Sequence, residues 1–235
     1  LYWTNIYYDE SPNLINTEKA LIRLGLIHWQ MRSLSILVAF FEQSEFFIDV
    51  VSGYGCYFAL FPELFTAPLM ADYNHLTEAE AIRELAKYSD PIRKRFQEFA
   101  ISYNINIITG SMPYLEGGNL YNVGFLCKRD GTFEMYAKIH VTPNEVQHWG
   151  MKGGSEIKTF DTDCGKIGVM MCYDVEFPEL SRLMADEGIN ILFVPFLTDT
   201  PNAYPRVKHC SQAPTIENDC LVAIAGCVGN LPKVN

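Results

Sequence analysis

Short runs that are apolar on both faces constrain most strongly how this chain can fold. CYFALFPE, INILFVPF and CLVAIAGCVGN occupy residues 56–63, 189–196 and 220–230, and none of them alternates regularly between apolar and polar positions. Such strands are typical of sheets that are covered on both faces, and they recur here between helix-like segments. We therefore expect an α/β fold in which helices cover partly parallel sheets.

Periodicity and turn signals place the remaining elements. Predicted helices cover 36–52, 77–104 with an interruption near Pro91, 177–188 and 204–218, and further predicted strands cover 22–30, 105–113, 120–128, 132–140 and 164–174. Thr77 and Glu80 have the spacing of a capping box. Asp130-Gly131 lies between two strand-like runs and predicts a hairpin.

The length of 235 residues, 49% of them hydrophobic, is enough to bury one sizeable core. Residues 1–20 show no clear period, and we expect them to form a linker or N-terminal extension before a domain that spans 21–235. The sequence stops directly after a predicted strand. We therefore expect that a closing C-terminal segment is missing.

Charge and hydropathy narrow the classes of partner. The net charge is −10, and no extended cluster of Lys and Arg stands out, which argues against nucleic acid and anionic membranes as partners. The longest apolar run, 34–41, is far shorter than the roughly 18 residues that span a bilayer. We expect a small-molecule substrate and no membrane partner.

The seven cysteines have an odd count, scattered spacing and no CxxC pair. This pattern favours neither a zinc site nor a disulfide framework, so we expect no metal. Free cysteines in apolar runs are typical of a reducing compartment, and we expect a cytoplasmic location.

The tetrapeptide FPEL occurs twice, and a Cys-Tyr pair lies upstream of each copy. Cys172 ends a predicted strand before a predicted helix, a position where α/β proteins place active sites. A buried, inert cysteine is the competing interpretation. Glu63 follows an apolar strand, so its pKa is expected to be raised as a general base requires. An acid in the first turn of a helix is the alternative for Glu63.

Lys138 in YAKIH lies near the end of a strand with apolar and aromatic neighbours. A lysine there needs a carboxylate partner unless it is a solvated edge residue, and taken alone the solvated edge is the better interpretation. None of the five histidines has an acidic neighbour at a spacing that indicates a catalytic pair, so a Cys-His pair is possible but not indicated. The three strand-end residues Glu63, Lys138 and Cys172 are more persuasive together than singly.

Together these segments resemble the nitrilase, or carbon-nitrogen hydrolase, superfamily. The resemblance rests on FPE around Glu63, YAKIH around Lys138 and CYDVEFPE around Cys172, with GSMP at 110–113, YNVGFLCKRDG at 121–131 and IEN at 216–218 in support. It implies a four-layer αββα sandwich and a Glu63-Lys138-Cys172 triad. It also implies a supporting carboxylate at Glu145 and an oxyanion contact from the backbone N–H of Tyr173.

The resemblance further implies a cysteine-dependent hydrolase of non-peptide carbon-nitrogen bonds, an amidase that forms a thioester and needs no cofactor. A nitrilase, an N-carbamoyl hydrolase and a catalytically silent protein of the same fold stay open as alternatives. A chain that folds but is inactive without its C-terminal segment is a further alternative. Superfamily members usually form homodimers or larger homo-oligomers, and we expect the same here.

HWQMR, APLMADYN, VQHWGMKGG and VPFLTDT resemble a subgroup in which an acetyltransferase domain precedes the hydrolase. Two departures from the family pattern stand out: Glu176 occupies a position where many relatives have Arg, and Pro214-Thr215 replace an Arg-Ala pair. We expect the first to change a surface or pocket charge and the second to disturb a helix. From their positions near strand ends, Phe65, Tyr121, Phe196 and Thr198 are candidate pocket residues. For the two phenylalanines an apolar core role is at least as good an interpretation.

Overall fold

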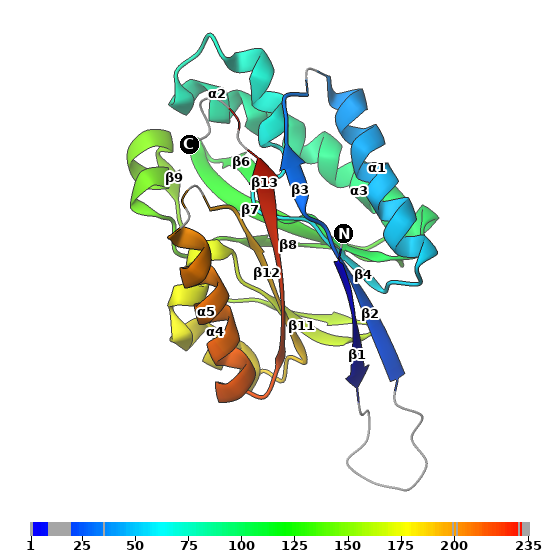
Figure 1. The fold of residues 1–235 in the computed structure, drawn as a ribbon. Coiled ribbons are helices and arrows are strands. Elements are labelled where there is room, and N and C mark those ends of the chain that lie inside the picture. The colour runs from blue at the N-terminus through cyan, green and yellow to red at the C-terminus, as the bar shows by residue number, and fades with distance from the viewer. Residues whose placement is uncertain are drawn as a thin grey trace, which may run out of the picture.

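Two β-sheets packed face to face form the centre of the protein, and helices cover the outer face of each (Figure 1). The computed structural model describes residues 2–8, 20–34, 36–198, 200, 202–229 and 231. The predicted four-layer αββα sandwich is confirmed.

The first sheet has eight strands in the order β1-β2-β4-β5-β7-β6, and β8 and β9 also pair with β7. Its strands are β1 (Tyr2–Tyr8), β2 (Ala20–Leu26), β4 (Phe58–Leu60), β5 (Asn106–Ile108), β6 (Met112–Glu116), β7 (Asn119–Cys127), β8 (Phe133–Ala137) and β9 (Met151–Lys152). The pairs β2–β4 and β4–β5 are parallel, whereas β7 is antiparallel to β5, β6 and β8.

The second sheet has five strands in the order β10-β11-β12-β13-β3. These strands are β3 (Trp29–Met31), β10 (Thr159–Thr162), β11 (Gly165–Val169), β12 (Ile191–Phe196) and β13 (Leu221–Gly229). From β11 to β3 every pair is parallel, as the apolar runs predicted.

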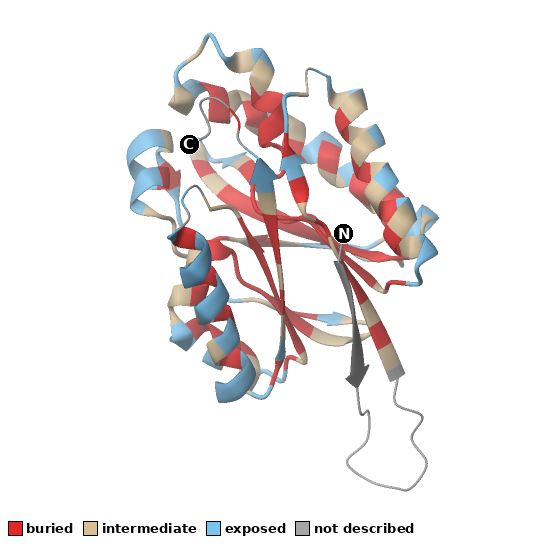
Figure 2. Ribbon diagram, viewed as in Figure 1, coloured by how far each residue is buried: buried red, intermediate tan, exposed pale blue. Residues whose placement is uncertain are grey.

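The helices α1 (Leu37–Gly53), α2 (Glu78–Leu85) and α3 (Ser89–Ser102) belong to the first sheet's outer layer, and α4 (Pro178–Asp186) and α5 (Ala203–Glu217) to the second's. Strand β4 shows why the runs are apolar on both faces. Phe58 and Leu60 join the cluster between the sheets, while Ala59 and Phe61 join the cluster under the helices. Figure 2 shows the buried strands between helices with exposed outer faces.

Several predicted boundaries change. The single strand expected at 22–30 is two strands, β2 and β3, which belong to different sheets. Strand β10 was not predicted. The helical region expected at 77–104 breaks at the 3₁₀ turn Ala86–Tyr88, and Pro91 lies in the first turn of α3, where proline is tolerated. The capping box of Thr77 and Glu80 and the hairpin at Asp130-Gly131 are confirmed.

Within the segment expected as a linker, Tyr2–Tyr8 form β1 and pair antiparallel with β2, while 9–19 lie outside the described residues. Pro214 lies inside α5, which continues through it to Glu217, so the expected disturbance does not end the helix. The predicted C-terminal segment would follow residue 235 and stays a prediction. Among the described helices, none combines the length and apolar character that crossing a bilayer requires.

Candidate active site

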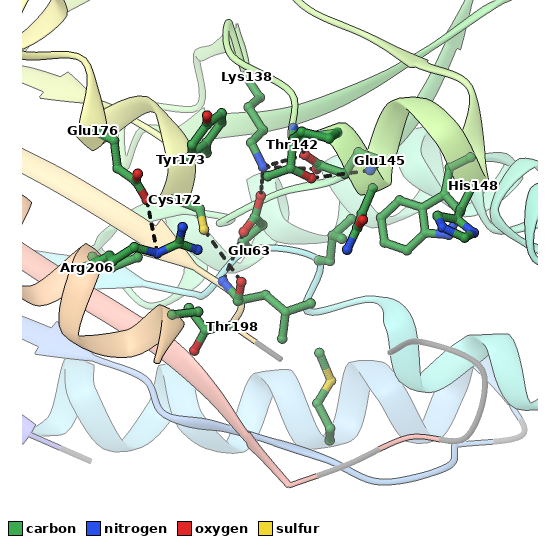
Figure 3. A pocket seen from close by; sticks show the side chains of 18 of the residues that line it. Glu63, Lys138, Thr142, Glu145, His148, Cys172, Tyr173, Glu176, Thr198 and Arg206 are labelled. Carbon is green, nitrogen blue, oxygen red and sulfur yellow. Dashed lines mark hydrogen bonds and ion pairs between the residues drawn. The ribbon is translucent and has the colours of Figure 1, made fainter. Parts of the chain in front are cut away.

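The three predicted triad residues meet in one place although 109 residues separate the first from the last. Glu63 follows β4, Lys138 follows β8, and Cys172 begins the short 3₁₀ helix η4 (Cys172–Glu176) after β11. Both sheets therefore contribute to the site. Figure 3 shows the three side chains converging on a common pocket.

Lys138 is the centre of a buried ionic cluster. Its Nζ donates to Glu63 Oε1 at 2.8 Å and to both Glu145 oxygens at 2.9 and 2.8 Å, and the residue is only 1% exposed. Burial opposes its charged form, but the Glu63 and Glu145 carboxylates outweigh burial and hold the Lys138 pKa above its ordinary value. The solvated-edge interpretation of Lys138 is therefore wrong.

Glu145 is held by its own loop as well as by the lysine. It begins the π-helix η3 (Glu145–Trp149), and its Oε2 accepts from the Thr142 backbone N–H at 2.7 Å. In return, the Glu145 N–H donates to Thr142 Oγ1 at 3.2 Å. The expectation that Glu145 supports the cluster agrees with this geometry.

Asn122 joins the two carboxylates, and the sequence reasoning did not single it out. Its Nδ2 donates to Glu63 Oε1 at 3.0 Å and to Glu145 Oε1 at 3.2 Å from the middle of β7. A buried amide inside the run YNVGFLC was the available signal, because a buried polar side chain needs partners.

Glu63 has one carboxylate oxygen in the ionic cluster and one outside it. Oε2 accepts from the Leu197 N–H at 2.9 Å, which ties the residue to the end of β12. Burial raises the Glu63 pKa above its ordinary value, although the nearby Lys138 ammonium pulls the other way. A carboxylate with a raised pKa has the property that a general base requires near neutral pH.

The turn that carries Glu63 is tightly determined. Leu64 has a φ of 49°, and its N–H donates to Ser111 Oγ at 3.1 Å. Gly110 lies against the same turn, where an added Cβ would come within 1.9 Å of the Pro62 carbonyl oxygen. Glu63 is thus fixed by backbone packing as well as by its hydrogen bonds.

Cys172 lies in a strained backbone position at the start of η4. Its φ is 44°, in the left-handed region that non-glycine residues rarely adopt, and strain of this kind gathers at functional sites. Its Sγ donates to the Leu197 carbonyl at 3.5 Å. Burial first, and then the Glu63 carboxylate, raise the pKa of the Cys172 thiol well above its usual value. The resting group is therefore a thiol beside a base.

Asp174 ties the turn that carries Cys172 to the loop that follows Lys138. Its carboxylate accepts from the backbone N–H groups of His140 at 2.7 Å, Met171 at 3.2 Å and Ile139 at 3.4 Å. Burial raises the Asp174 pKa, against these backbone donors. The sequence reasoning did not assign Asp174 a role, although it lies inside CYDVEFPE.

A cavity of about 610 Å³ opens above the cluster. Its lining includes Glu63, Lys138, Glu145, Cys172, Tyr173 and the predicted pocket residue Thr198. It also includes Glu176 and Arg206. The sequence did not predict that these two residues lie together at the cavity. Across the described residues, no group of three His, Cys, Asp or Glu side chains is arranged to hold a metal ion.

Three predicted pocket residues do not line this cavity. Phe65 is fully buried in an aromatic cluster, with its ring centroid 5.2 Å from that of Phe61. Tyr121 is next to Asn122 on β7, so alternation directs it to the face opposite the site. Phe196 is buried against Gly226 and Tyr204. Each of these side chains packs in a core.

Comparison with known proteins agrees with this geometry. The family model described as carbon-nitrogen hydrolase matches residues 3–234. The probable hydrolase YhcX of Bacillus subtilis is 40% identical over 98% of this chain, and the chain spans only 45% of that relative's length. The 2-oxoglutaramate amidase of the same organism is 28% identical over 81% of this chain and 71% of its own.

Solved structures share the fold. Nit3 of Saccharomyces cerevisiae, a member of branch 10 of the nitrilase superfamily, has a TM-score of 0.77 at 22% identity, covering 89% of this chain and 77% of its own. An amidase from Nesterenkonia sp. has a TM-score of 0.73 at 22% identity, with 89% and 77% covered. The match over nearly the whole chain shows that this protein belongs to the carbon-nitrogen hydrolase family.

Proposed function

We propose that this chain is an amidase that hydrolyses the carbon-nitrogen bond of a small amide through a thioester on Cys172. The observation that supports it best is the buried Glu63-Lys138-Glu145 cluster directly beside a cysteine in a strained turn. The cluster supplies a base and a fixed positive charge next to the sulfur. Relatives named as amidases of 2-oxoglutaramate and of deaminated glutathione support an amide substrate.

Acylation begins with proton transfer from the Cys172 thiol to Glu63, because the raised thiol pKa leaves little thiolate in the resting enzyme. The sulfur attacks the amide carbonyl carbon, and a C–S bond forms. Lys138 Nζ and the Tyr173 N–H then stabilise the oxyanion. Glu63 returns the proton to the leaving nitrogen, the C–N bond breaks, and ammonia or an amine departs.

Deacylation repeats the proton transfers with water. Glu63 takes a proton from a water molecule, whose oxygen attacks the thioester carbon. The C–S bond breaks, the carboxylic acid is released, and the proton on Glu63 returns to the sulfur. In this scheme Glu145 and Asn122 position Lys138 and Glu63 and do not touch the reacting atoms.

The test is ammonia release from a panel of primary amides, nitriles and N-carbamoyl compounds, measured with wild type and with Cys172→Ala. We expect turnover of amides by the wild type and none above background by Cys172→Ala. Cys210→Ala, a cysteine on α5 outside the cavity lining, is the matched control and should keep its activity. Full activity in Cys172→Ala would overturn the proposal, and turnover confined to nitriles or N-carbamoyl compounds would reassign the reaction.

Three predictions about context remain proposals. The seven free cysteines support a reducing, cytoplasmic location. Exposed apolar side chains on α4 and α5, Leu183 and Ile216 among them, support homo-oligomer formation, which sedimentation velocity measures. The resemblance to relatives that carry a preceding acetyltransferase domain also stays a prediction.

A further inference from the structure

Glu176 and Arg206 form an ion pair on the nucleophile's side of the cavity. Glu176 is the last residue of η4, and Arg206 lies on α5. Figure 3 shows the pair beside Cys172, with Glu145 and His148 on the opposite side of the cavity. The triad chemistry proposed above does not use either residue.

The contact between the two side chains is weak and open. Arg206 Nε lies 3.7 Å from Glu176 Oε1, which is too long for a hydrogen bond. The arginine side chain is 63% exposed and the glutamate side chain 23% exposed. Exposed ion pairs contribute little to stability, so Arg206 can be displaced from the carboxylate at small cost. Glu176 is the more sheltered partner and stays in the cavity wall.

The charges around the cavity favour a cation over an anion. Among the described lining residues, four carboxylates (Glu63, Glu78, Glu145 and Glu176) face two permanent cations, Lys138 and Arg206. Lys138 is committed to two of these carboxylates. Glu78 lies 3.9 Å from His148 on the opposite side. Among the described lining residues, Glu176 is therefore the carboxylate on the Cys172 side of the cavity, and its ion-pair partner Arg206 can be displaced.

The position of Glu176 sets a distance for whatever it binds. It follows Cys172 by four residues on a 3₁₀ helix, and a rise of about 2 Å per residue separates their Cα atoms by roughly 8 Å along the axis. A group bound by Glu176 thus lies a few carbon atoms from the carbonyl that Cys172 attacks.

We propose that Glu176 is a specificity-determining residue which binds a cationic group of the substrate, so that the preferred substrate is a primary amide bearing an ammonium group a few carbons from the carbonyl. Arg206 occupies the carboxylate when substrate is absent and swings out when the substrate's cation takes its place. This inference rests on the proposed amidase function.

The test uses three primary amides that carry an ammonium, a methyl or a carboxylate at the end of the same four-carbon chain: 5-aminopentanamide, hexanamide and adipamic acid. We expect kcat/KM for the ammonium amide to exceed that for the methyl amide by about tenfold, which lies between the bulk-water and protein-surface limits for a charge pair near 4 Å. The carboxylate amide should be the poorest. The ammonium preference should shrink as salt is added.

Variants assign the preference to one side chain. Glu176→Gln should bring the ammonium and methyl amides to within about twofold, mainly through KM, because a specificity contact acts on binding. Arg206→Gln should strengthen the preference by removing the competitor. Glu179→Gln removes the same charge from an exposed position outside the lining and should leave the preference unchanged. Thermal unfolding of each variant checks that it is folded.

If the enzyme prefers adipamic acid and Arg206→Gln abolishes that preference, the proposal is overturned and Arg206 is the specificity residue. An ammonium preference that survives in Glu176→Gln would overturn it too. Calorimetric titration of 5-aminopentanamide into Cys172→Ala measures the affinity for this amide without turnover. The same titration into the Cys172→Ala, Glu176→Gln double variant shows how much of that affinity depends on Glu176. Weaker binding to the double variant supports the proposal even if no amide is hydrolysed. Hydrolysis of hexanamide with no ammonium preference refutes it while the amidase function stands.

Discussion

The two FPEL copies have the same four side chains and opposite environments. In the first copy all four residues are buried, and the chain continues into a turn in which Leu64 has a φ of 49°. In the second, Pro178 begins α4, and Glu179 is exposed in the helix's first turn. Arg182, one turn further along α4, donates from Nη2 to the Glu217 carbonyl at 3.0 Å.

The difference shows that the flanking sequence decides what FPEL does. The first copy follows a strand buried between both layers, its Phe61 packs against Phe65, Phe96 and Trp29, and its carboxylate is only 2% exposed at the floor of the cavity. The second follows η4, the 3₁₀ helix that begins at Cys172, and forms the first turn of α4. Burial with a lysine partner makes a tunable base, whereas exposure makes a solvated acid.

The largest contrast is expected in activity. Glu63→Gln removes the proposed base and should lower kcat by about 10³-fold, in the range typical of general acid-base catalysis. Glu179→Gln should leave kcat close to that of the wild type, because Glu179 is exposed and lies outside the cavity lining. Ammonia release under saturating amide measures both. Equal losses would mean that the two copies do not differ in function.

The phenylalanines should separate the copies in stability. Phe61→Ala empties a fully buried site and should lower the free energy of unfolding by about 3–5 kcal/mol. Phe177 is partly exposed and stacks on His140 with ring centroids 3.5 Å apart, so Phe177→Ala should cost about 1 kcal/mol. Urea denaturation measures both, and a larger loss for Phe177→Ala would contradict the assignment of Phe61 to the core.

The pH dependence should report Glu63. Its pKa is raised above the ordinary value of 4.5, and the base must be deprotonated to act, so kcat/KM should fall as the pH drops through a value above 4.5. Asn122→Leu removes a hydrogen bond to the carboxylate form and should move this acid limb to higher pH. Glu179→Gln should not move it. If the acid limb did not move in Asn122→Leu, the group that titrates would not be Glu63.

The smallest contrast concerns the leucines. At residue 64 the positive φ favours glycine over alanine, so Leu64→Gly should be about 1 kcal/mol more stable than Leu64→Ala. At residue 180, inside α4, Leu180→Gly should be roughly 0.5–1 kcal/mol less stable than Leu180→Ala. Urea titration of the four variants tests the opposite signs, and the same sign at both positions would contradict the different backbones of the two copies.

Much of the fold and the convergence of Glu63, Lys138 and Cys172 could be predicted from sequence, because apolar runs mark buried strands and these three residues lie in strongly patterned segments. The separation of β2 from β3 could not be predicted, since Ile27 and Trp29 continue one apolar run while the chain changes sheets. Strand β10 is short and follows no apolar run, so it gave no signal.

The surroundings of the triad were harder to predict for a different reason. Asn122 and Asp174 act through contacts to residues 59 and 34 positions away, and no local pattern encodes such distances. The pocket assignments of Phe65, Tyr121 and Phe196 were wrong because closeness to a strand end does not say which face a side chain occupies. The face that a side chain occupies is set by strand register, which follows from the whole fold.

The central claim is that Cys172 is the nucleophile and Glu63 its base, and one measurement tests it most directly. An acid-quenched reaction with a saturating amide, followed by peptide mapping in a mass spectrometer, locates the acyl group and times its appearance. We predict an adduct on Cys172 that forms about 10³-fold more slowly in Glu63→Gln and at the wild-type rate in Glu179→Gln. An adduct on Cys56, or on Cys227, whose Sγ lies 3.5 Å from the Glu63 carbonyl, would contradict the account.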